Sequence, residues 1–175
     1  MTREKRTASA LDPSGLERLA LRYVERFATS RGKLTQYLER KIRERGWDAA
    51  VAADPAGVAQ RMADLRYVDD RAYAEAKVAA MTRRGLGARR VAIALRQAQI
   101  DEADTREVEP AVAEHAIDSA LTFARRRRIG PFGPPGADRA LREKQIAAML
   151  RAGHGFDLSR KIVHAEREIG PDDLF

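Results

Sequence analysis

LRYVDDRAYAEAKVAAMTRRGLGARRVAIALRQAQID, residues 65–101 of this 175-residue chain, has the sequence pattern of a helical hairpin. Asp69 or Asp70 is placed to cap a helix, because a carboxylate at that position accepts hydrogen bonds from free backbone N–H groups. Gly85 and Gly87 follow the apolar spacing, which predicts that the helix ends there and that the chain turns into a second helix. The expected buried faces of the two helices are made by Ala74, Val78, Met81, Val91, Leu95 and Ala98.

The charges of this hairpin have one sign over a long stretch. Between Glu75 and Asp101 there is no acidic residue. The cations of the same stretch are Lys77, Arg83, Arg84, Arg89, Arg90 and Arg96. This pattern predicts a positive field that attracts an anionic partner.

The hairpin pattern occurs three times along the chain. The upstream copy is ALRYVERFATSRGKLTQYLERKIRERGWD (20–48), and the downstream copy is DSALTFARRRRIGPFG (118–133) followed by LREKQIAAMLRAGHGFD (141–157). The copies end alike, at a large apolar residue followed by an Asp that is expected to cap a third helix: Trp47-Asp48, Ile100-Asp101 and Phe156-Asp157. Their spacing of about 50 to 56 residues is near that of helical repeat units.

These copies predict an all-α fold that is elongated and solenoid-like, with three tandem three-helix repeats. The expected boundaries are a disordered N-terminal tail (1–13), repeat 1 (14–68), repeat 2 (69–115), repeat 3 (116–170) and a short acidic tail (171–175). In the first helix, Leu16, Leu19, Ala20, Tyr23 and Phe27 form one apolar stripe, so both aromatic residues are expected to pack in the core.

Two motifs of the central hairpin resemble a known family. Tyr67-Val68-Asp69-Asp70-Arg71-Ala72-Tyr73-Ala74 and Arg84-Gly85-Leu86-Gly87-Ala88-Arg89-Arg90-Val91 are similar to the paired signature of the RecX family, regulators of the bacterial recombinase RecA. The chain departs from the family pattern at Ala88, where proline is common, and at His154-Gly155, an insertion before Phe156. The resemblance implies binding to RecA and its nucleoprotein filament, with effects on ATP hydrolysis, filament extension and strand exchange.

Composition limits the kinds of partner and compartment. The formal net charge is +7 and the isoelectric point is about 10.1, which favours nucleic acid or an acidic protein surface as the partner. Arginine outnumbers lysine, which suits phosphate and carboxylate, although a GC-rich genome gives the same bias. With no cysteine, no apolar leader and no long apolar run, the chain is expected to be cytoplasmic and to have no membrane partner.

The junction between the first and second helices is basic in every copy. The first junction contributes Arg31 and Lys33 and the third contributes a run of four arginines, of which two can face one partner because successive helical residues splay by about 100°. The candidate partner-binding or DNA-binding residues are Lys77, Arg83, Arg84, Arg89, Arg90, Arg96, Arg31, Lys33, Arg125 and Arg126. In a solenoid these residues would line up as one basic strip for a partner. The simpler alternative is that the charges only keep exposed helix faces solvated.

No catalytic, metal or cofactor site is expected. The glycines of Gly85-Leu86-Gly87 lack the lysine of a phosphate loop, and the three histidines lack the spacing of zinc ligands. The sequence therefore predicts a non-enzymatic, monomeric regulator that binds RecA and the RecA–DNA filament, and DNA as a direct second partner. The alternatives are a general DNA-binding helical protein and a helical scaffold that recognises an acidic protein.

Overall fold

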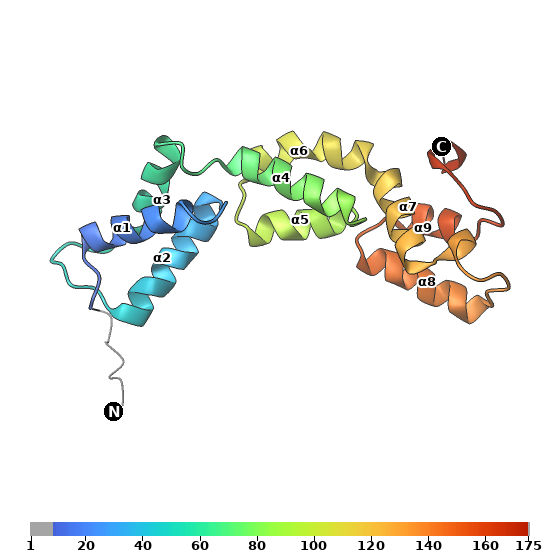
Figure 1. The fold of residues 1–175 in the computed structure, drawn as a ribbon, viewed down its shortest axis with the longest axis horizontal. Helices are drawn as coiled ribbons and strands as arrows, with labels where there is room; N and C mark the ends of the chain where they lie inside the picture. Colours follow the sequence, from blue (N-terminus) through green and yellow to red (C-terminus); the bar gives the residue numbers. More distant parts are fainter. Residues whose placement is uncertain (1–8, 175) are drawn as a thin grey trace, which may run out of the picture. The chain divides into compact units, whose positions relative to one another are not determined.

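The computed structural model describes residues 9–174, and within this range the chain is helical (Figure 1). Nine α-helices follow one another in the described residues: α1 (Pro13–Val24), α2 (Arg31–Arg45), α3 (Pro55–Asp64), α4 (Asp70–Arg83), α5 (Ala88–Gln97), α6 (Glu102–Glu114), α7 (Ala116–Arg127), α8 (Arg139–Arg151) and α9 (Phe156–Val163). Two short 3-10 helices are η1 (Gly130–Phe132) and η2 (Pro171–Leu174). The described residues contain no strand, which confirms the all-α class.

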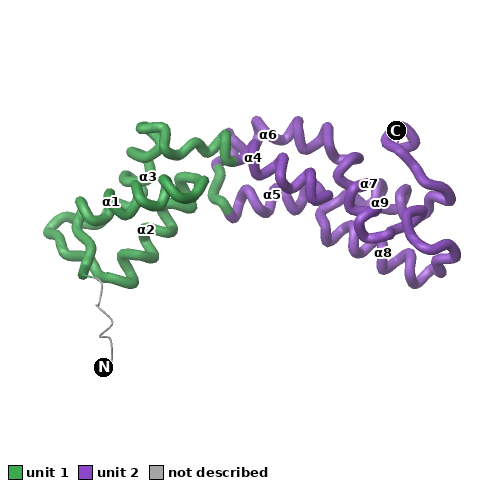
Figure 2. Tube along the Cα trace, in the orientation of Figure 1, with its two compact units in different colours: residues 1–73, 98–100 green, residues 74–97, 101–175 purple. Residues whose placement is uncertain are grey.

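The chain divides into two compact units (Figure 2). Unit 1 consists of the residues up to Tyr73 together with Ala98–Ile100, and unit 2 consists of Ala74–Gln97 together with the residues from Asp101 onward. Helix α4 therefore begins in unit 1 and continues in unit 2.

Unit 1 has its core among α1, α2 and α3, which pack on one another. The predicted stripe of α1 places Leu16 and Ala20 in this core, and α2 adds Leu34 and Leu38, all at most 1% exposed. Phe27 follows α1 and is 52% exposed, so the prediction that it packs in the core is wrong. The helical spacing fails there because α1 ends at Val24.

Most helix starts have a carboxylate or hydroxyl cap, and the predicted cap Asp101 is among them. The side chains of Asp12, Ser30, Asp54, Asp101 and Asp138 each accept a hydrogen bond from the backbone N–H three residues later. Two predicted caps are wrong. Helix α3 starts only after Asp54, so Asp48 caps no helix, and Gly155 precedes α9, so Asp157 lies inside its first turn.

Residues 9–12 are part of unit 1, although the sequence assigned them to a tail. Leu11 is 2% exposed, and its backbone N–H and C=O bond to Gly46 O and Asp48 N at 3.0 and 2.8 Å. Trp47 is half-buried against the unit 1 core and donates its indole N–H to Val51 O at 2.8 Å. The part of the predicted N-terminal tail before residue 9 lies outside the described residues.

The three repeat ends do not occupy equivalent environments. Ile100 is 7% exposed and Trp47 is half-buried, whereas Phe156 is 53% exposed. Phe156 is the first residue of α9. The prediction of a common apolar repeat end is therefore wrong at Phe156.

The two acids before α4 have different roles. Asp69 accepts from the backbone N–H of Ala72 at 2.8 Å and is the cap. Asp70 is 7% exposed and accepts from the backbone N–H and Nε of Arg31, at 2.7 and 2.9 Å. Of the two predicted alternatives, Asp69 is therefore the cap, and the partner of Asp70 lies 39 residues earlier in the chain.

Replacing Asp70 by Ala is expected to lower the free energy of unfolding by about 2 kcal/mol, because two charge-assisted hydrogen bonds are lost. The cost stays below that of a fully buried ion pair because the side chain of Arg31 is 37% exposed. Asp69→Ala removes only a helix cap and should cost about 1 kcal/mol. Urea denaturation of both variants measures this order, and a larger loss for Asp69→Ala would contradict it.

The turn at residues 98–100 completes unit 1. The hydroxyl of Ser30 donates to the carbonyl of Ala98. A Cβ atom on Gly32 would lie 2.2 Å from Cβ of Gln99, so the start of α2 and this turn are in close contact. Unit 1 is thus assembled from two separate stretches of sequence.

Unit 2 has a core in which α7, α8 and α9 pack on one another. The residues at its centre are Ala120, Leu121, Ala124, Met149 and Ile162, each at most 1% exposed.

The predicted apolar faces of the central hairpin are confirmed, since Ala74, Val78, Met81, Val91, Leu95 and Ala98 are all buried. Leu174, in the predicted acidic tail, is also buried in unit 2.

Candidate site for an anionic partner

A surface pocket of about 670 Å³ in unit 2 is lined by cations from three helices. Helix α5 contributes Arg90, the end of α7 contributes Arg127 and Arg128, and α8 contributes Lys144 and Arg151. All five residues are exposed, and no Asp or Glu lines the pocket. We call these five residues the cationic pocket.

The helical repeat of α8 explains one wall. Leu141, Lys144, Ala148 and Arg151 recur at intervals of three and four residues, so they lie on one face of the helix. Asp138 caps α8 by accepting from Leu141 N at 2.7 Å, which fixes where the helix starts and hence which residues face the pocket.

The end of α7 supplies the opposite wall. Arg128 adopts the left-handed conformation, with φ 53° and ψ 50°, and the next residue, Ile129, is 3% exposed. The backbone N–H of Ile129 bonds to Ala124 O at 2.9 Å and closes the last turn. Cations at this end are favoured by the helix dipole, whose negative pole lies at the C-terminus.

The floor of the pocket is apolar. Leu86, Phe123 and Ile129 line it, and the guanidinium of Arg127 lies 6.0 Å from the Phe123 ring centroid. Leu141 is 44% exposed at the same pocket. An apolar floor with cations around it suits a partner that offers phosphate or carboxylate groups next to apolar surface.

A close backbone contact holds the α4–α5 turn in place within unit 2. Gly87 N donates to Ala152 O at 2.9 Å, and Arg89 N donates to Gly153 O at 3.2 Å. Gly85 ends α4 as predicted, with φ 76° and its N–H on Thr82 O. Gly87 is needed for a different reason from the one predicted, because a Cβ there would lie 2.5 Å from the Gly153 carbonyl.

His154 is buried at this contact, at 3% exposed. Its Nε2 donates to Gly85 O at 3.1 Å, and its ring centroid lies 5.6 Å from that of Phe123. Burial lowers the pKa of His154 from its ordinary value near 6.5, and this effect outweighs the opposing effect of the bond to Gly85. The imidazole is therefore neutral in the folded protein at neutral pH.

The stability of the protein should fall as the pH drops below about 6.5, because the unfolded chain then binds a proton at His154 before the folded chain does. The loss continues down to the lowered pKa of the folded state. Urea midpoints at neutral and acidic pH should show a smaller acid loss for His154→Gln than for the wild type. Equal pH dependence in the two proteins would contradict the assignment.

The structure places the ten predicted site residues in different settings. Arg90 lines the cationic pocket, while Arg83 lines a groove of about 490 Å³ with Glu75 and Glu107. Arg31 pairs with Asp70, and Lys33 donates to the hydroxyl of Tyr73 at 3.1 Å. Arg125 lies 5.1 Å from the ring centroid of Phe132. The remaining residues are half-buried or exposed on helix surfaces and turns: Lys77, Arg84, Arg89, Arg96 and Arg126.

Four residues of the cationic pocket were not among the sequence candidates: Arg127, Arg128, Lys144 and Arg151. The first two belong to the predicted arginine run, but the direction in which each side chain points depends on where α7 ends. Lys144 and Arg151 could have been noticed as two cations seven residues apart, which share a helix face. A continuous strip across all the helical repeats remains a prediction.

Two further findings concern other kinds of site. No group of three or more His, Asp or Glu side chains in residues 9–174 is arranged to hold a metal ion. None of the helices in that range is both long and apolar enough to cross a bilayer.

The described residues thus form a helical protein that carries a pocket lined by exposed cations. Comparison with known proteins identifies the family. Residues 69–108 match the family model described as RecX, second three-helix domain. The chain is 31% identical over 169 residues to the regulatory protein RecX of Myxococcus xanthus strain DK1622, covering 87% of this chain and 86% of that protein. The chain belongs to the RecX family.

Other relatives agree with this result. The regulatory protein RecX of Agrobacterium fabrum strain C58 is 30% identical over 112 residues, covering 63% of this chain and 59% of that protein. The crystal structure of RecX from Lactobacillus salivarius superposes with a TM-score of 0.63 at 18% identity, over 86% of this chain and 93% of that chain. A second crystal structure, of a regulatory protein RecX, gives a TM-score of 0.56 at 19% identity, over 85% and 72% of the two chains. The structures show the shared fold.

Proposed function

We propose that this chain is a cytoplasmic, non-enzymatic regulator that binds RecA and its nucleoprotein filament and modulates ATP hydrolysis, filament extension and strand exchange. The ATP chemistry belongs to RecA. The chain acts by occupying surface that the filament uses.

The cationic pocket is the observation that carries the proposal. It gathers five exposed cations from α5, α7 and α8 around an apolar floor, with no acidic residue in its lining. A nucleoprotein filament offers both phosphates and protein surface, and a pocket of this mixed character suits both. Membership of a family of regulatory proteins supports the same reading.

The test compares binding of the full chain to bare DNA, to RecA alone and to RecA on DNA at one fixed salt concentration, because electrostatic affinity changes steeply with salt. The tightest binding is expected for RecA on DNA, together with slower ATP hydrolysis by the filament. Equal affinity for bare DNA and for the filament would contradict a RecA-specific function.

General DNA binding is the second candidate, and one observation favours it. The isoelectric point of about 10.1 gives the protein a positive field at any physiological pH. If electrostatic attraction to DNA were the only function, the chain would not bind RecA alone. Added salt would then abolish its binding to bare DNA and to the filament in parallel.

A further inference from the structure

A second cationic surface lies in unit 1, on α1, α2 and the residues just after α1, and it contains stacked aromatic rings. The rings of Tyr23 and Tyr37 are stacked, with centroids 4.1 Å apart and planes at 26°. Phe27 extends the group, with its centroid 5.1 Å from that of Tyr23. We call Tyr23, Phe27, Lys33, Tyr37, Arg40 and Arg43 the aromatic–cationic surface.

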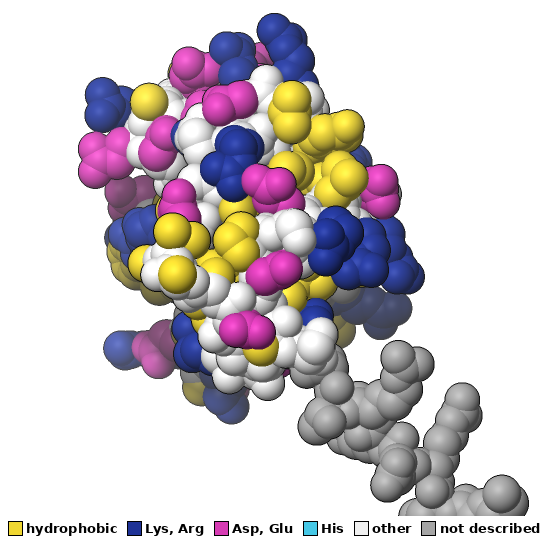
Figure 3. All heavy atoms as spheres, turned by 90° about the vertical axis from the view of Figure 1, so that its left-hand side faces the viewer, with side chains coloured by type: hydrophobic (Ala, Val, Ile, Leu, Met, Phe, Trp, Pro, Cys, Tyr) yellow, Lys and Arg dark blue, Asp and Glu magenta, His cyan; other side chains and the backbone are white. Residues whose placement is uncertain are grey.

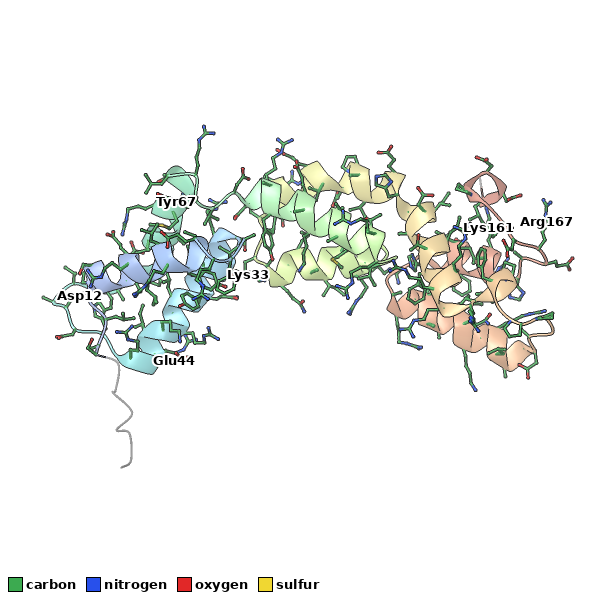
Figure 4. The ribbon with its side chains drawn as sticks, viewed as in Figure 1. Asp12, Lys33, Glu44, Tyr67, Lys161 and Arg167 are labelled. Atoms are coloured by element: carbon green, nitrogen blue, oxygen red, sulfur yellow. The ribbon has the colours of Figure 1, made fainter. Side chains whose placement is uncertain are left out.

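Cations lie next to the rings. Arg40 lies 5.6 Å from the ring centroid of Tyr37, and Arg26 lies 5.9 Å from that of Phe27. Lys33, labelled in Figure 4, lies in the first turn of α2. It donates to the hydroxyl of Tyr73, in the same unit, at 3.1 Å. Viewed from the side of unit 1, Lys and Arg side chains gather beside exposed hydrophobic ones, with Asp and Glu side chains among them (Figure 3).

The surface is hollowed on both sides of the tyrosine pair. One pocket, of about 490 Å³, is lined by Tyr23, Lys33, Gln36, Tyr37, Glu39, Arg40 and Arg43. The other, of about 260 Å³, is lined by Leu19, Arg22, Tyr23, Glu25, Arg26, Phe27 and Tyr37. The two pockets together are lined by five Lys and Arg side chains and two Glu side chains. The surface around the rings therefore has a net positive charge.

We propose that the aromatic–cationic surface of unit 1 binds single-stranded nucleic acid, with unpaired bases stacking on Phe27 and the tyrosine pair and phosphates contacting the surrounding cations. Aromatic rings set in a cationic groove are how proteins hold single strands without sequence preference. Phe27 is 52% exposed, so its ring is open to a ligand rather than used by the core.

The combination of rings and charges favours a single strand over a duplex. In a duplex the faces of the bases are already stacked on one another, so exposed rings add nothing to binding. Gln36, Glu25 and Glu39 also lie in the two pockets and can accept hydrogen bonds from N–H groups on the Watson–Crick edges of bases. In a duplex these edges are occupied by base pairing.

The test measures fluorescence anisotropy of a labelled oligothymidine and of a labelled duplex of equal length, with the full-length chain and without RecA. The wild type should bind the single strand more tightly. Phe27→Ala should weaken single-strand binding about fivefold to hundredfold, the range for losing one base–aromatic stack, and leave duplex binding unchanged. Phe27 is exposed enough that this variant should fold normally.

Two matched variants complete the test. Tyr37→Phe keeps the ring and should retain single-strand affinity, whereas Tyr37→Leu should lose it. Tyr67, another tyrosine of unit 1, is 54% exposed and lies outside the surface, so Tyr67→Ala should bind like the wild type (Figure 4). Equal affinity for single strand and duplex, no binding of bare nucleic acid, or an unaffected Phe27→Ala variant would each overturn the proposal. Because RecA is absent, such a failure leaves the proposed function standing.

Discussion

Replacing Lys144 and Arg151 together by Ala is expected to weaken binding to the RecA–DNA filament by about thirtyfold, or about 2 kcal/mol. Both side chains are exposed on one face of α8 and line the cationic pocket, so each lost contact should cost about 1 kcal/mol. If the contacts are to phosphates, the salt slope of binding should become shallower by about 0.7 to 0.9 per contact. The melting temperature should hardly change, because neither side chain is buried.

A matched pair on α5 gives the control. Arg89 and Arg96 are also exposed and also seven residues apart on one helix, but they lie outside the pocket lining. Changing both to Ala removes the same charge, so a smaller loss is expected if the pocket is the site. A larger loss for the α5 pair would favour the strip predicted from the sequence and would overturn the assignment to the pocket.

Gly87→Ala is expected to destabilise the protein by about 3 kcal/mol, at the upper end of the usual cost of overpacking. The added Cβ would lie 2.5 Å from both C and O of Gly153 and 2.6 Å from the backbone N of His154. Backbone atoms cannot rotate away as a side chain can, so the α4–α5 turn has to move. Arg90 should move with it, and filament binding should weaken as well.

Gly155 offers the control for that substitution. No atom lies within 4 Å of the position where its Cβ would be built, and its backbone is extended, with φ −68° and ψ 154°. Gly155→Ala should therefore cost about 0.5 kcal/mol, the loss of a favourable helix-start residue. Denaturant unfolding of the two variants measures the difference, and similar losses would show that Gly87 is not held by the close contact.

The helices could be read from the sequence because their signals are local. The apolar spacing of the central hairpin and a cap such as Asp101 depend on residues within a few positions of each other, and the structure agrees with both. The failures come from contacts between distant positions. The sequence predicts Asp70 as a possible cap, but the fold places Arg31 against it. The sequence predicts Gly87 as part of a helix end, but the fold places the backbone of Gly153 beside it.

The candidate site was harder to predict for the same reason. The hairpin arginines were visible as a run of charge, but the pocket forms where α5, α7 and α8 converge. Which arginine of the run after Ala124 faces it depends on the left-handed residue Arg128, and no spacing rule gives that conformation. Phe27 was assigned to the core because its spacing fits a helix that in fact ends at Val24.

The turn at residues 98–100 has a consequence for how the protein emerges from a ribosome. Unit 1 needs the carbonyl of Ala98 for Ser30, yet the stretch from Ala74 to Gln97 belongs to unit 2 and is synthesised in between. A nascent chain released only as far as Tyr73 would hold the three helices of unit 1 without the carbonyl to which the Ser30 hydroxyl donates. Unit 1 can therefore reach its final state only after residues 98–100 have left the exit tunnel, so α4 and α5 are released before unit 1 is complete.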